Sequence, residues 1–154
     1  MSTASTRLAR VARTALGLAL LAAPVRSAAA QDVMTAVSAK HIEAILTGMG
    51  FDFTQKNDHT WKFELGEKNV LLFLENDNTD AQLYIGFGDT KVSMSKMNEW
   101  NKSHRFTRAY ADDESNPVLE SDLDFAGGVT DETIKTWIKL YGTQVRAYVK
   151  YLTD

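Results

Sequence analysis

The sequence predicts an α+β fold in which helices pack on an antiparallel sheet, in the order α-β-β-β-β-α-β-β-α. Some segments repeat apolar residues at helical spacing, and others place them at every second residue, as strands do. Strand-helix alternation is the pattern of a parallel sheet, and this sequence does not show it. The expected architecture is therefore an antiparallel sheet with helices packed on it.

Three helices are expected. The first covers about residues 35–49, where one face carries the apolar residues Ile42, Ile45, Leu46 and Met49. The second, over residues 93–102, is short and begins at Ser93, whose hydroxyl can cap the first turn. The last is capped by Thr130 and has the clearest apolar stripe: Ile134, Trp137, Ile138, Tyr141, Val145, Tyr148 and Leu152. Gly142 is expected to weaken it by roughly 1 kcal/mol relative to alanine.

Strand-like segments fill the remainder, at residues 51–53, 61–65, 70–74, 83–87, 106–111 and 118–125. Asn57 and Asp58 are expected to form the turn before the second. Residues 70–74 are continuously apolar, so this strand is expected to be central and covered on both faces. The polar loop 112–117 is typical of a hairpin between the last two.

The first thirty residues have the pattern of a cleavable signal peptide. Arginines at positions 7, 10 and 13 precede an uncharged run over residues 15–23, and Ala28, Ala29 and Ala30 follow. That run is far shorter than the ~20 residues that cross a bilayer. We expect Sec-type export, cleavage after Ala30, a periplasmic or secreted product without a stable membrane anchor, and one domain over residues 31–154.

Charge and cysteine content exclude several classes of function. Without the four arginines of residues 1–30, the chain has 13 Lys and Arg against 20 Asp and Glu, a formal charge of −7. Such a domain lacks the basic surface that nucleic acids require, and an anionic membrane would repel it. With no cysteine, it contains no disulfide, thiolate metal site or cysteine nucleophile.

Familiar catalytic and metal-binding motifs do not fit the sequence. His41, His59 and His104 occur in different elements and never at the spacing of a helical metal site. The acidic stretch Glu75–Asp80 departs from a calcium loop at the required glycine and at the last glutamate. No complete nucleotide-binding loop or nucleophile elbow is present. No catalytic, metal or cofactor residue is therefore assigned.

Acidic residues near the last two strands allow two interpretations. Glu120, Asp122 and Asp124 alternate along one strand, so they share a face. The favoured interpretation is a solvated polar face, paired with Arg105 or Arg108. The alternative is a metal-dependent or acid-base enzyme that uses Asp112, Glu120, Asp122 and Asp124.

The second half of the chain resembles the YbjN family of bacterial proteins. The residues that carry the resemblance include Asn98, Trp100, Asn101, Arg105, Arg108, Tyr110, Asp122, Gly127 and Gly128. The resemblance implies a sensory transduction regulator with a fold like that of type III secretion chaperones, which bind polypeptide. A structural role is expected for most of these positions: Trp100 anchors the short helix, and Asn98 and Asn101 bond nearby backbone groups.

The leading hypothesis is thus a non-enzymatic exported module that binds a partner protein or an extended peptide. The binding site is expected on a sheet edge or in a groove between helix and sheet. A small-molecule carrier remains a further alternative, which would need a closed apolar cavity lined by Phe63, Phe73, Phe87 and Trp137. The sequence leaves open whether the domain forms a homodimer.

Overall fold

The computed structural model describes residues 32–88 and 90–153. Its helices are α1 (Ala39–Gly48), α2 (Met94–Ser103) and α3 (Asp131–Thr153). Its strands are β1 (Phe53–Asn57), β2 (Thr60–Leu65), β3 (Lys68–Glu75), β4 (Asp80–Gly86), β5 (Arg108–Ala111) and β6 (Pro117–Asp124), with a 3-10 turn η1 (Asn76–Asn78) before β4. The predicted class and element order are confirmed. The predicted signal peptide and its cleavage after Ala30 lie outside the described residues.

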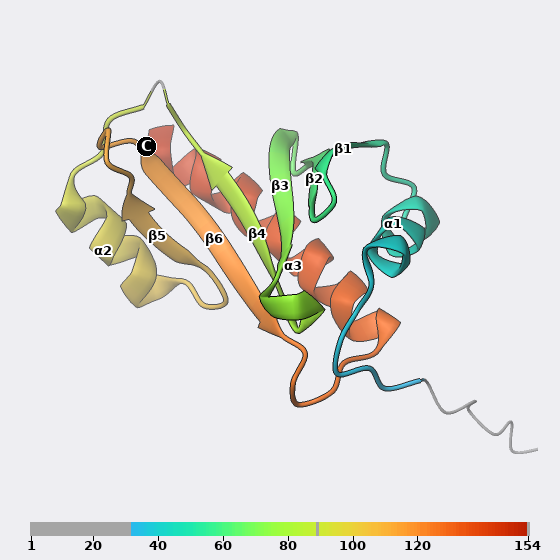
Figure 1. The fold of residues 1–154 in the computed structure, drawn as a ribbon. Coiled ribbons are helices and arrows are strands. Elements are labelled where there is room, and N and C mark those ends of the chain that lie inside the picture. The colour runs from blue at the N-terminus through green and yellow to red at the C-terminus, as the bar shows by residue number, and fades with distance from the viewer. Residues whose placement is uncertain (1–31, 89, 154) are drawn as a thin grey trace, which may run out of the picture.

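The six strands form one antiparallel sheet in the order β1-β2-β3-β4-β6-β5. The strands β1 to β4 form a meander, and the hairpin β5-β6 then adds β6 beside β4 and leaves β5 at the edge (Figure 1). The short α2 lies between β4 and β5 in the chain, and the neighbour of β4 in the sheet is β6 rather than β5.

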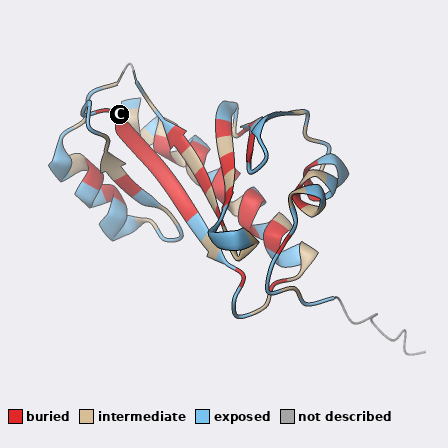
Figure 2. Cartoon of the chain, viewed as in Figure 1, coloured by how far each residue is buried: buried red, intermediate tan, exposed pale blue. Residues whose placement is uncertain are grey.

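The expectation that residues 70–74 are covered on both faces was wrong. In β3 the buried residues Val70, Leu72 and Leu74 alternate with half-buried ones, so only one face of this strand is fully covered. The strand covered on both faces is β6, where residues 117–121 are all buried (Figure 2). The apolar run therefore indicated a buried strand but not how many of its faces are buried.

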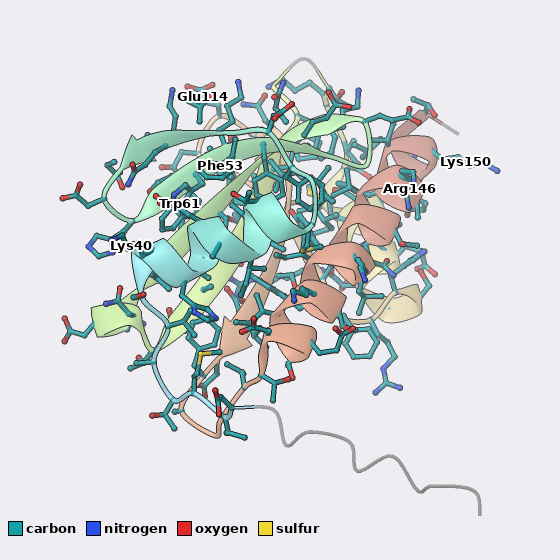
Figure 3. The ribbon with its side chains drawn as sticks, turned by 90° about the vertical axis from the view of Figure 1, so that its right-hand side faces the viewer. Lys40, Phe53, Trp61, Glu114, Arg146 and Lys150 are labelled. Atoms are coloured by element: carbon teal, nitrogen blue, oxygen red, sulfur yellow. The ribbon has the colours of Figure 1, made fainter. Side chains whose placement is uncertain are left out.

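All three helices contribute to one core on one face of the sheet. In α3, Tyr141 donates to the carbonyl of Leu119 at 2.6 Å, while Arg146 and Lys150 project from its outer side (Figure 3). At one end of α3, the ring of Trp100 from α2 lies 4.7 Å from that of Tyr148. At the other flank, Trp61 of β2 donates to Glu43 of α1 at 3.1 Å. The opposite face carries no helix of the described chain (Figure 1).

Helix starts follow local capping bonds. Ser93 accepts the N–H of Lys96 at 3.2 Å, and Thr130 accepts that of Thr133 at 3.2 Å, as expected for α2 and α3. The first helix begins later than the expected residue 35, because Ser38 is its cap and accepts the N–H of His41.

Two further expectations need correction. The strand expected at residues 51–53 begins at its last residue and continues to residue 57, as β1. The strand expected from Phe106 begins at Arg108, because Phe106 has a left-handed φ of 69° that breaks the strand. Gly142 is not simply a weak point of α3, because a Cβ there would lie 2.8 Å from Leu65. This glycine lets β2 approach the helix closely.

Candidate functional site: the helix-free face of the sheet

Cross-strand register determines which side chains occupy the helix-free face. Because neighbours in register point to the same side of a sheet, the face can be followed from strand to strand. One row across it contains Leu71, Tyr84, Glu120 and Arg108. The next rows contain Phe73, Gln82 and Asp122, and then Glu75, Asp80 and Asp124. The face thus combines half-buried apolar side chains with carboxylates.

A buried carboxylate occupies the middle of this face. Glu120 is only 2% exposed, and it pairs with the guanidinium of Arg108, whose side chain is 66% exposed. The other carboxylate oxygen accepts the hydroxyl of Tyr110 at 2.8 Å. The Arg108 guanidinium also lies 5.6 Å from the Tyr110 ring centre, a cation–π distance. The buried Glu120 carboxylate and the Tyr110 ring thus hold the exposed Arg108 guanidinium in place at the surface.

An open pocket of about 240 Å³ lies beside this cluster. Its lining residues are Phe106, Thr107, Arg108, Glu120, Ser121 and Asp122. The Phe106 ring is 65% exposed, and the Arg105 guanidinium lies 5.6 Å from its centre. An exposed aromatic ring beside ordered polar groups is a common feature of protein contact surfaces.

The loop between β5 and β6 is held by its own carboxylate. Asp112 accepts the N–H of Asn116 at 2.8 Å and that of Glu114 at 3.0 Å. These bonds, led by that of Asn116, and the nearby charge of Lys91 lower the pKa of Asp112 below its ordinary value. Burial raises the pKa of Tyr84 on the neighbouring strand, and the nearby Tyr110 and Asp112 raise it further.

The four acids of the enzyme hypothesis are not brought together around one point. Glu120 is buried and bonded, Asp112 belongs to the loop, and Asp122 and Asp124 are exposed. Among the described residues, no group of three His, Cys, Asp or Glu side chains is arranged to hold a metal ion. The interpretation as a solvated polar face was also wrong for Glu120, although its predicted partner Arg108 is the one observed.

The residues expected to line a carrier cavity lie apart. Phe63 and Trp137 belong to the core, whereas Phe73 is on the helix-free face, where its ring lies 6.2 Å from that of Tyr84. Phe63, Phe73 and Phe87 line three different surface pockets. Alternation along the strands places Phe63 and Phe73 on opposite sides of the sheet.

The two sheet edges differ in how they are protected. At β5, the side-chain amide of Asn101 accepts the N–H of Ala109 at 2.8 Å and donates to its carbonyl at 2.9 Å. Asn101 therefore takes the place of a neighbouring strand. At β1, a register shift between Gln55 and Asn57 and the exposed Lys56 interrupt the edge. Irregularity and lysine at an edge discourage strand addition.

The other family positions lie around α2 and the loop before α3. Trp100 is fully buried, and its indole N–H donates to Thr107 at 3.2 Å. Asn98 is exposed and makes no side-chain hydrogen bond with the described residues, so its expected backbone bond is not found. Gly128 has φ +91°, and a Cβ there would lie 2.6 Å from Val33, whereas Gly127 has open space around it.

The three histidines make separate contacts in different parts of the fold. His41 bonds Asp131 at 2.6 Å and so joins α1 to the start of α3. His104 stacks on Trp100 with ring centres 3.5 Å apart. His59 lies in the turn before β2.

Sequence reasoning missed Phe73, Gln82 and Tyr84 as members of the site. Each occupies an alternate strand position, which is a signal that was available. The pairing of β4 with β6, which brings them beside Glu120 and Asp122, has no local signal in the sequence.

Two of three comparisons with known proteins identify the fold and the family. Among curated proteins none matches this sequence. A crystal structure of YbjN from E. coli matches with a TM-score of 0.60 at 15% identity and covers 75% of this chain and 90% of that chain, which shows a common fold. No helix in the described part of the chain has the length and apolar character needed to cross a membrane. The model of a family described as "Putative bacterial sensory transduction regulator" matches residues 38–154, and the chain therefore belongs to this family, YbjN.

Proposed function

We propose that this protein is an exported, non-enzymatic regulator that binds a partner protein or an extended peptide on the helix-free face of its sheet. The observation that carries the proposal is the face itself. Half-buried Phe73 and Tyr84 lie beside the Arg108, Tyr110 and Glu120 cluster, and no helix of residues 32–88 or 90–153 covers them (Figure 1). Aromatic and arginine side chains held in place on a surface favour protein binding.

The edges of the sheet support a face rather than an edge as the docking surface. Asn101 occupies the hydrogen-bonding groups of Ala109 at β5, and β1 is irregular and carries Lys56. A partner strand that added at β5 would have to displace Asn101, and one that added at β1 would have to fit its irregular register. The proposed docking surface is therefore the helix-free face and not a sheet edge.

The states of the acids support binding rather than catalysis. A general acid or base must be free to exchange a proton with a substrate. Both oxygens of Glu120 are occupied by Arg108 and Tyr110. Asp112 has a lowered pKa and serves the loop. The description of the family as a regulator agrees with this role, and so does the chaperone-like fold that the family resemblance implies.

Site-specific photocrosslinking in intact cells tests the docking surface. A photoreactive residue at Gln82 or Asp122 would report contacts of the helix-free face, and one at Arg146 or Lys150 would report the outer side of α3. We expect a discrete adduct from the first pair and none from the second. Adducts of equal yield from all four positions, or none at all, would refute the proposed surface.

Export is tested separately by sequencing the N-terminus of the protein from the periplasmic fraction. The arginines and the apolar run of residues 1–30 support cleavage after Ala30. The expected first residue is Gln31. A protein that keeps Met1 and stays in the cytoplasm would remove this part of the proposal and leave the docking surface untouched.

A further inference from the structure

The helix-free face has an apolar part that is followed along the strands by polar and then acidic side chains. On β4, Tyr84, Gln82 and Asp80 share this face, because they occupy alternate positions. The ring of Tyr84 lies 6.2 Å from that of Phe73, edge to face, and Leu71 is half-buried in the same row as Tyr84. The surface therefore changes from apolar to acidic over the length of one strand.

Four carboxylates form the acidic end of this face. Glu75, Asp80 and Asp124 are in register across β3, β4 and β6, and Asp122 is on the same face of β6. Like charges opposite each other in a sheet are destabilising, so a cation placed above them relieves repulsion as well as forming its own contacts. We refer to these four residues as the acidic end.

Only neutral groups bond the acidic end within the described chain. The carboxylates of Asp80 and Asp122 accept the side-chain amides of Asn76 and Gln82, respectively, and a backbone N–H donates to Asp124 at 2.7 Å. The ion pairs found among residues 32–88 and 90–153 involve none of the four acids. The acidic end therefore presents uncompensated negative charge to whatever covers it.

Two positive residues of the same face lie in a different row. Lys62 and Arg108 share the row of Tyr84, which is four residues along β4 from Asp80, or about 14 Å in an extended strand. Arg108 is already paired with Glu120. The face is thus divided by charge, and its acidic end is open to a cation from outside.

An open pocket of about 380 Å³ is lined both by the apolar part and by the acidic end. Phe73 and Glu75 contribute to it from β3, and the exposed Asp58 contributes from the turn before β2. Lys and Arg side chains lay their aliphatic stems on apolar surface while the charged head stays at its polar rim. A cation is also attracted to the face of an aromatic ring. The pocket therefore has the chemistry to hold a Lys or Arg side chain.

We propose that the partner of the helix-free face presents an extended segment with Lys or Arg at one position and a large apolar residue four positions away. The cation binds at the acidic end with its stem against Phe73, and the apolar residue packs on Tyr84 and Leu71. The spacing follows from β4, because Asp80 and Tyr84 are four residues apart on one face and an extended partner laid along the strand has the same rise per residue. The inference rests on the proposed function, since it names the chemistry of the partner for the same surface.

Titration of the isotope-labelled protein with synthetic peptides, followed by nuclear magnetic resonance, tests the proposed chemistry. The protein is produced in its own host, so that its N-terminus is the natural one. The probe is a capped nine-residue peptide of Ser and Thr with Arg at position 3 and Phe at position 7. We expect the amide signals of Asp80, Gln82 and Tyr84 to shift on binding, and those of Arg146 and Lys150 to stay unchanged.

Charge and spacing in the peptide are varied separately. Glu in place of the peptide arginine should raise Kd at least about tenfold, because like charges then face each other. At about 1 M salt, where the screening length is about 3 Å, this difference should largely disappear. With Phe moved to position 6, its ring points to the other side of an extended chain and binding should weaken. Equal affinity for both spacings would refute the extended segment.

Single-charge variants of the protein locate the contact. Asp80→Asn should reduce the preference for the Arg peptide over the Glu peptide. Glu99→Gln on α2 is the matched control: it removes one exposed carboxylate away from the face and should leave the preference unchanged. Insensitivity to Asp80→Asn, or equal effects of the two variants, would refute the acidic end as the site of the cation.

Failure of this inference is distinguishable from failure of the proposed function. Equal affinities for the Arg and Glu peptides, together with photocrosslinks in cells from Gln82 or Asp122, would remove the proposed partner chemistry and leave the docking surface in place. Absence of those photocrosslinks would refute the docking surface whatever the peptides do. Absence of any shift with all peptides at millimolar concentration would refute the proposed segment.

Discussion

Tyr141 and Tyr148 both bury their rings on the inner side of α3, but only one hydroxyl is bonded. Tyr141 donates to Leu119, whereas the Tyr148 hydroxyl is buried and has no partner among the described residues. Burial raises the pKa of both, that of Tyr148 to about 12. Tyr141→Phe should lower the free energy of unfolding by about 1 kcal/mol, because the Leu119 carbonyl loses its donor. Tyr148→Phe should leave it unchanged or raise it. Urea unfolding measures both, and equal losses would contradict the assignment.

Asp112 should give the protein a distinct acid sensitivity. Its pKa is lowered in the folded state, chiefly by the N–H of Asn116, so folding favours the ionised form. Its contribution is therefore complete above the ordinary value of 3.8 and is lost as pH falls through the lower folded value. Asp112→Asn should be less stable than the parent at neutral pH, and the difference should shrink as pH falls below 3.8 and vanish in strong acid. A difference that grows with falling pH would show the opposite sign of coupling.

Glu120 shows what residue-level reasoning could and could not foresee. Its alternation with Asp122 correctly placed both on one face, and Arg108 was correctly named as a partner. Register places Glu120 between Tyr84 and Arg108, and Tyr110 bonds it from the same strand as Arg108. Register between distant strands is set by the whole sheet, so the sequence around Glu120 holds no sign of it.

At the scale of elements, the packing of α2 against β5 depends on one amide. Asn101 makes two hydrogen bonds with Ala109, so Asn101→Ala leaves both backbone groups at the edge without these partners. We expect a loss of roughly 2 kcal/mol in the free energy of unfolding, at about 1 kcal/mol for each bond. The exposed edge should also promote self-association, visible in size-exclusion chromatography. Asn98→Ala on the same helix is the control, since Asn98 is exposed, and it should change neither quantity.

Elements with local signals were predictable, and those shaped by contacts were not. Ser93 and Thr130 fix the starts of α2 and α3 by bonds within four residues, so their patterns sufficed. The space around Gly142 is set by Leu65 on another element. Helix propensity therefore predicted a cost at Gly142 but not the close approach of Leu65 to this position.

For the molecule as a whole, the order of elements was predictable but the order of strands was not. Hydrophobic periodicity along the chain identified the helices and strands one by one. The placement of β6 between β4 and β5 makes its two faces the most covered of the sheet, and it also assembles the helix-free face. Both consequences arise from long-range pairing, which local patterns do not contain.

The charge distribution of the whole molecule predicts a salt dependence of stability. Residues 31–154 carry a formal charge of −7, from 13 Lys and Arg against 20 Asp and Glu, and Asp80 faces Asp124 directly. Repulsion of this kind weakens as salt screens it, so the free energy of unfolding of residues 31–154 should rise from low salt to about 0.3 M. Asp124→Asn keeps the oxygen that accepts the N–H of Ala126 and removes one charge. It should therefore stabilise at low salt by a few tenths of a kcal/mol and lose that advantage at high salt. Urea unfolding at both ionic strengths gives the two differences. A gain in stability that persists at high salt would show that it does not come from removal of the Asp124 charge.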